Sequence, residues 1–168
     1  MDDETFDNWV GKFDLLCEEK FKVGLIGSMF FAGVITGTLF IPALADAFGR
    51  KLIVIIAFIL ALIGQLGLIL TNNLYEAYVY QFLIGSSFAG RIIVALNYAL
   101  EFNIKRWHEI IITWLLISEA CGTIVITIWY QFIDRGWFLL QLICLIVGIL
   151  CLLYVIFVVP ESPKWLYI

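Results

Sequence analysis

Two ionisable residues stand out because they lie deep inside long apolar runs of the sequence. Arg91 lies about 15 Å from Glu101 at the helical rise of 1.5 Å per residue, and Glu119 lies at a similar depth in the next run. A charge at the centre of a membrane costs about 2.5–3.5 kcal/mol to insert, so such residues are rare and normally have a partner. We therefore predict that Arg91 and Glu119 face the interior and neutralise each other.

The residues that share a helical face with these two charges are also polar. Ser87 and Tyr98 share the face of Arg91, whereas Thr123 and Tyr130 share that of Glu119. Such a pair of charges could form a substrate or ion site in a polar cavity. It could also be a structural ion pair, or a contact with another subunit, and the sequence leaves these alternatives open.

Motifs of enzymes and metal sites are not recognisable in the sequence. There is no nucleophile elbow, no phosphate-binding glycine loop and no HExxH motif. His108 is the single histidine, and three of the four cysteines lie within apolar runs, where a thiol behaves as a small hydrophobe. We expect neither catalysis nor a metal or other cofactor.

The composition indicates a protein whose solvent is lipid. Of the 168 residues, 63% are hydrophobic and only 14% are charged. A soluble domain carries roughly 25% charged residues. The net charge of −4 and the lack of a basic stripe also argue against a nucleic-acid partner, because phosphate binding needs clustered Lys and Arg.

Five apolar segments are long enough to cross a bilayer, which takes about 20 helical residues. Backbone groups in hydrocarbon must bond internally, so these segments are helices and the fold class is an all-α integral membrane protein. The expected spans are Val23–Ala45, Leu52–Leu70, Ala77–Leu100, Ile110–Ile133 and Phe138–Val159. Short connections make consecutive helices antiparallel.

The segments that flank this bundle differ from it in composition. We divide the chain into an acidic N-terminal segment (1–22), the five-helix bundle (23–159) and an exit segment (160–168). The first segment lacks the layout of a signal peptide. An apolar stripe along it predicts a short amphipathic helix that either lies in the membrane interface or packs on protein. The stripe consists of Phe6, Trp9, Val10, Phe13, Leu16 and Cys17.

The distribution of basic residues predicts the orientation of the bundle. Cytoplasmic loops carry an excess of Lys and Arg, and one side of the predicted bundle is richer in them. We expect this basic end to be cytoplasmic, or its topological equivalent. The sequence does not identify the membrane, and an organelle membrane such as the mitochondrial inner membrane is compatible with it. The residues of the basic end are Arg50, Lys51, Lys105, Arg106 and Lys164.

The first span contains two glycines four residues apart, Gly33 and Gly37. Small residues at this spacing let another helix approach closely. The pattern is compatible with packing inside the bundle or with a dimer seam.

Several motifs resemble the major facilitator superfamily, in particular its organic cation/anion transporter branch, which is related to the sugar porters. "LADAFGRK" resembles the loop signature between the second and third helices of that family, and "PESPKWL" resembles the motif after its sixth helix. "QFLIGSSFAG" and "NYALEF" are similar to its fourth helix. Matching loop residues are Asp46, Gly49, Arg50, Lys51, Glu101 and Arg106. The exit motif comprises Pro160, Glu161, Ser162, Pro163 and Lys164.

The departures from the family pattern fall in the same motifs. Pro42 stands where the family has glycine, Ala47 where it has arginine, and Gln81 where it has another arginine. Arg91 stands where family members usually carry an apolar or small residue. In complete members the loop aspartate, here Asp46, helps to latch the two halves of the transporter together.

The resemblance implies that the five segments correspond to family helices two to six. Alternating access needs two bundles that rock against each other, so the chain alone is not expected to transport. Our leading hypothesis is a non-transporting accessory subunit of a larger membrane assembly. Other membrane subunits would then fill the groove of the absent first helix. The alternative hypothesis is one half of an assembled transporter for a small organic ion or sugar.

Overall fold

The computed structural model describes residues 9–13, 15–16, 18–133 and 136–162. All regular structure within these residues is helical, and no strand occurs among them. The elements are α1 (Trp9–Lys12), α2 (Lys20–Phe48), α3 (Arg50–Leu70), α4 (Leu74–Ala89), η1 (Gly90–Val94), α5 (Ala95–Glu101), η2 (Lys105–Trp107), α6 (His108–Phe132) and α7 (Trp137–Phe157). The predicted all-α fold class is confirmed.

Within the part of the chain that the structure describes, five helical stretches are long and apolar enough to span a membrane, as the sequence predicts. Each contains most of an expected span and differs from it by a few residues at its ends. The spans are Lys20–Phe48, Arg50–Leu70, Leu74–Glu101, Lys105–Phe132 and Trp137–Phe157. The chain is therefore a multi-pass integral membrane protein.

The third span is not a uniform helix. Its centre, η1, is a π-helix of five residues inserted between α4 and α5, and it carries Arg91. Short π segments are rare and frequently occur at functional sites. Gly90 opens this segment close to α3, because a Cβ on it would lie 2.4 Å from the Cβ of Ala57. The sequence did not predict this break in the helix.

The tightest packing lies between α2 and α4, where glycines remove the side chains between the two backbones. A Cβ on Gly37 would lie 2.3 Å from the carbonyl oxygen of Ser86, and one on Gly85 would lie 2.0 Å from that of Phe30. Gly33 makes the same kind of approach to Phe82. The small-residue pattern in α2 therefore serves packing inside the bundle.

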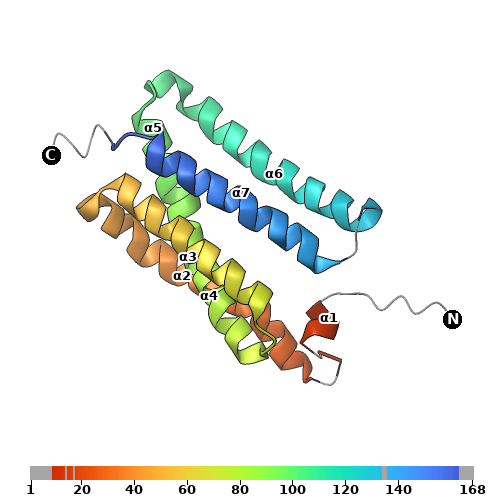
Figure 1. The fold of residues 1–168 in the computed structure, drawn as a ribbon. Coiled ribbons are helices and arrows are strands. Elements are labelled where there is room, and N and C mark those ends of the chain that lie inside the picture. The colour runs from red at the N-terminus through yellow and green to blue at the C-terminus, as the bar shows by residue number, and fades with distance from the viewer. Residues whose placement is uncertain (1–8, 14, 17, 134–135, 163–168) are drawn as a thin grey trace.

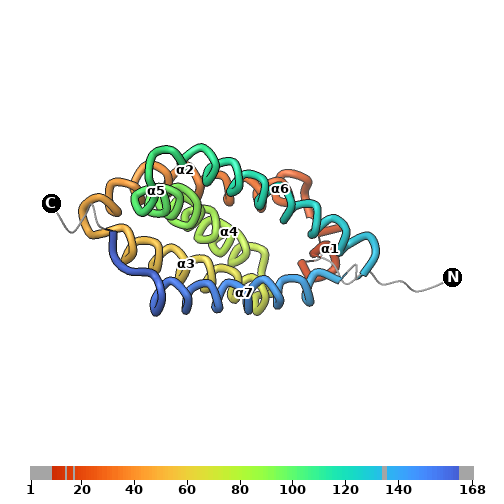
Figure 2. Tube along the Cα trace, turned by 90° about the horizontal axis from the view of Figure 1, so that it is seen from above, coloured from red at the N-terminus to blue at the C-terminus, as the bar shows by residue number. Residues whose placement is uncertain are grey.

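The remaining two long helices flank this core differently. α7 lies along α3 in both views, whereas α6 runs at the edge of the molecule (Figures 1 and 2). The main contacts of α6 are with η2 and α5 at its own first turns, and none of its residues is buried. Most of the length of α6 is therefore exposed, although the Trp129 Nε1 near its end is buried.

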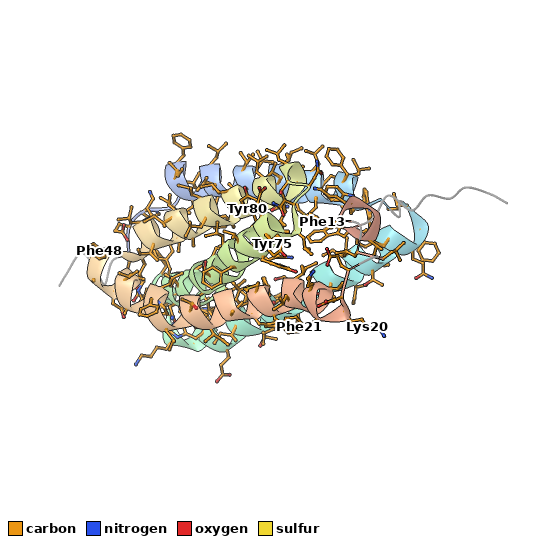
Figure 3. The ribbon with its side chains drawn as sticks, turned by 90° about the horizontal axis from the view of Figure 1, so that it is seen from below. Phe13, Lys20, Phe21, Phe48, Tyr75 and Tyr80 are labelled. Carbon is orange, nitrogen blue, oxygen red and sulfur yellow. The ribbon has the colours of Figure 1, made fainter. Side chains whose placement is uncertain are left out.

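The N-terminal segment packs on protein where it is described. Phe13, which follows α1, is buried beside Leu68 and Tyr78. It lies near Tyr80, at the end of the bundle opposite Phe48 (Figure 3). The Lys12 ammonium donates to the carbonyls of the last α3 residues, 2.6 Å from Leu68 O. Phe6 and Cys17 of the predicted stripe lie outside the described residues, and Leu16 is 85% exposed, so the stripe is not one buried face.

Candidate functional site

The matching loop residues are brought together by a turn of one residue between α2 and α3. Gly49 alone separates the two helices, and its φ of 101° is a conformation that L side chains rarely adopt. The turn places Arg50 at the start of α3 within reach of Asp46 in the last turn of α2. The distance between Arg50 Nη2 and Asp46 Oδ1 is 3.2 Å.

Arg50 also bridges to the end of α5. Its Nη2 lies 3.1 Å from Glu101 Oε1, and both side chains are well shielded, with 16% and 12% exposure. Asp46 is 71% exposed. Solvent screens an exposed ion pair far more than a shielded one. The Arg50–Glu101 pair is therefore the stronger of the two contacts.

The exit segment after α7 completes the cluster through Glu161. One oxygen of this carboxylate accepts from the backbone N–H of Lys51 at 3.1 Å and from that of Ser162 at 3.0 Å. The first N–H groups of a helix have no partner within the helix, and a carboxylate there also suits the helix dipole. Glu161 thus caps the start of α3.

Three further hydrogen bonds tie the same helix ends together. The Lys51 ammonium donates to Ile156 O in the last turn of α7, at 3.0 Å. Ser162, which is fully buried, donates through its hydroxyl to Glu101, and the Tyr98 hydroxyl donates to Pro160 O. We call this assembly the helix-end network. It consists of Asp46, Arg50, Lys51, Tyr98, Glu101, Pro160, Glu161 and Ser162.

Most of the predicted motif residues lie in this network, and some do not. Arg106 is exposed and forms no ion pair among the described residues. Pro163 and Lys164 lie outside the described residues. Sequence reasoning missed Tyr98 as a network member, although its place one turn before Glu101 was a usable signal.

The two intramembrane charges are not brought together. Arg91 lies on the face of the buried residues Ser87 and Tyr98, as expected, and its Nε is buried without a hydrogen-bond partner among the described residues. Glu119 is exposed on α6. The predicted Arg91–Glu119 ion pair is wrong for this structure, because α6 contacts the bundle mainly at its start and Glu119 lies more than two turns further on.

A polar contact that sequence reasoning missed joins α3 to α7 inside the membrane. The amide nitrogen of Gln65 donates to Gln141 O at 3.0 Å and lies 3.2 Å from Gln141 Oε1. Two glutamines within apolar helices at similar depth from the same end could have indicated it. For metals, no group of three or more His, Cys, Asp or Glu is found among the described residues.

These features define a class: a polytopic helical membrane protein whose charged residues fasten the helix ends on one side. A family profile described as "Sugar (and other) transporter" matches residues 3–168. The chain belongs to this family of the major facilitator superfamily and resembles its organic cation transporter branch.

Three relatives illustrate the similarity. The chain is 30% identical to solute carrier family 22 member 15-like from Xenopus laevis, over 99% of this chain and 34% of that protein. It is 31% identical to human organic cation/carnitine transporter 2, over 94% of this chain and 28% of that protein. Solute carrier family 22 member 7 from Sus scrofa is 29% identical over 92% of this chain and 28% of its own length. The chain therefore spans about a third of these curated relatives.

Proposed function

We propose that the chain forms one half-bundle of an organic-ion transporter that works only when further membrane helices complete it. The observation that carries this proposal is the helix-end network. Four helices meet there through Arg50, Glu101 and Glu161, all of which match family motifs. Transporters of this kind work by rocking one bundle against another. A network that fastens the helix ends of one bundle is what such rigid-body motion requires.

The second part of the proposal is that other membrane helices cover α6. A charged side chain is costly where it faces lipid, and it normally points into a bundle or a cavity. α6 exposes Glu119 at its middle, on a helix that also exposes Ser118, Thr123 and Thr127, whose hydroxyls donate to carbonyls of α6 itself. Helices of other subunits, or of a longer form of this chain, would cover these groups and supply the missing rocking partner.

The proposed substrate class follows from the relatives. Human organic cation/carnitine transporter 2 is named for organic cations and carnitine, and it matches nearly all of this chain. We therefore favour a small organic ion over a sugar. A non-transporting accessory subunit would also require other helices to cover α6. The two possibilities differ in a transport assay, because only the half-transporter gives uptake.

The test is uptake into proteoliposomes that contain the chain together with the membrane proteins that co-purify with it in mild detergent. We expect saturable uptake of carnitine or a model organic cation by the complex and none by the chain alone. Arg50→Ala should slow uptake, because it loosens the helix ends, whereas the matched exposed change Arg106→Ala should leave it unchanged.

Two results would contradict the proposal. A stable complex that transports neither carnitine nor any organic ion of a broad panel would favour the accessory subunit. Uptake by the isolated chain would remove the requirement for completing helices.

A further inference from the structure

A pocket of about 540 Å³ opens between α3, α5 and α7. Its volume lies within the range of about 300–1,000 Å³ that small-molecule sites occupy. Apolar side chains dominate its walls, among them Val54 of α3, Ala99 of α5 and Leu150 of α7. Among the described residues, Arg91 is the only charged side chain that lines it.

Arg91 has no counter-ion on these walls. Its Nε is buried without a hydrogen-bond partner in the described part of the chain, and none of the lining residues is acidic. The carboxylates of Glu101 and Glu161 are engaged in the helix-end network, and Glu119 is exposed on α6. A guanidinium in an apolar environment requires an anionic partner, so the pocket has the charge that an anionic ligand complements.

We propose that this pocket binds a single-chain anionic amphiphile, with its carboxylate or phosphate group on Arg91 and its hydrocarbon chain against α7. The planar guanidinium presents donors that match both anions in a two-point contact. The apolar walls bury the hydrocarbon. This inference goes beyond the proposed function, because it holds whether or not the assembled protein transports.

The accessible rim of the pocket explains how such a ligand enters. Val147, Leu150 and Tyr154 line the pocket from α7 and are each more than half exposed. They lie on one side of a membrane-spanning helix, so the pocket opens sideways toward the membrane interior. A hydrocarbon chain can therefore enter from the bilayer.

The depth of Arg91 selects a single-chain ligand over a bilayer phospholipid. Arg91 is ten residues before Glu101 at the end of α5, which is about 15 Å along a helix. This is half of a hydrocarbon core about 30 Å thick. The phosphate of a two-chain phospholipid stays near the bilayer surface. A fatty acid or a lysophospholipid with a terminal phosphate can place its anion deeper.

The test uses the full chain in phosphatidylcholine nanodiscs and a photoreactive palmitate with a mid-chain diazirine. We expect saturable labelling of peptides from α3, α5 or α7 that line the pocket, with unlabelled palmitate as competitor. Hexadecanol has the same tail without the charge and should compete at least about 30-fold less well, as expected for loss of one partner of a buried charge pair. Equal competition by hexadecanol would overturn the proposal.

A variant without the charge provides the second test. Arg91→Met keeps an unbranched apolar stem but removes the guanidinium, and it should lower labelling by palmitate at least about 30-fold. The matched variant Arg106→Met removes an exposed charge outside the pocket and should label like the wild type. If Arg91→Met fails to fold, the melting temperature of the wild type is measured instead. Palmitate should raise this temperature and hexadecanol should not. The opposite result would contradict the proposed binding site.

Two further experiments test which anionic head groups the pocket accepts and whether Glu119 of the same chain pairs with Arg91. Competition by lysophosphatidate as strong as that by palmitate would extend the site to single-chain phosphates, whereas competition by two-chain phosphatidate alone would contradict it. Glu119→Gln should leave labelling unchanged. If only this variant is labelled, Glu119 itself occupies Arg91 in the wild type and the proposal is wrong.

Discussion

The α2–α4 contact and helix α6 differ strongly in how closely they are packed within the same membrane bundle. In the first, Gly37 and Gly85 bring two backbones so close that a single added carbon would lie 2.3 Å or less from a carbonyl oxygen. In the second, no residue of a 25-residue helix is buried, and Gly122 has no atom within 4 Å of where a Cβ would stand. Helices in lipid have no hydrophobic force between them, so close packing holds the first pair. α6 has no such contact along its length.

The largest expected effect breaks the tight contact. Gly85→Ala should lower the free energy of unfolding by about 3 kcal/mol or more, because the new methyl group meets the backbone of α2, which cannot move aside alone. The measurement is unfolding in mixed micelles followed by circular dichroism.

The matched control is the glycine of α6. Gly122→Ala adds the same methyl group in open space and should stabilise the helix by up to about 1 kcal/mol through the better helix propensity of alanine. A similar loss of stability in both variants would mean that α6 is as closely packed as α4, and the contrast between the two regions would fail.

An intermediate effect is expected at the helix-end network. This network holds helices together by ion pairs and hydrogen bonds, whereas the glycines do so by close packing. Glu101→Gln should cost about 2 kcal/mol, because the shielded Arg50 loses its charge-assisted partner. Asp46→Asn removes the other, largely exposed partner of the same arginine and should cost less than about 1 kcal/mol. Equal costs, or a strong dependence of the Glu101 effect on salt, would show that the network is open to solvent.

The sequence predicted the elements of this comparison better than the contacts between them. The five spans follow from apolar length, and the network residues Asp46, Arg50 and Glu161 follow from motifs, because both are local properties of the chain. Contacts between helices depend on how the faces of two helices fit together. A sequence pattern describes the face of one helix at a time. The prediction therefore placed Arg91 and Glu119 at a similar depth in the membrane, but the ion pair that it inferred from this depth is wrong. The π-helix at Arg91 has no sequence signal that we could identify.

The smallest effect is expected at the contact between α3 and α7, which lies between the two extremes. Gln65 and Gln141 are joined by hydrogen bonds across two otherwise apolar helices. A double-mutant cycle with Gln65→Leu and Gln141→Leu should give a coupling energy of about 0.6 kcal/mol, the average for such bonds in membranes, since the separated amides also find partners. The matched cycle of Gln65→Leu with Gln131→Leu on α6 should give none, because Gln131 is exposed at the far end of α6. A coupling near zero in the first cycle would leave packing, together with the Lys51 contact at the other end of α7, to hold this helix.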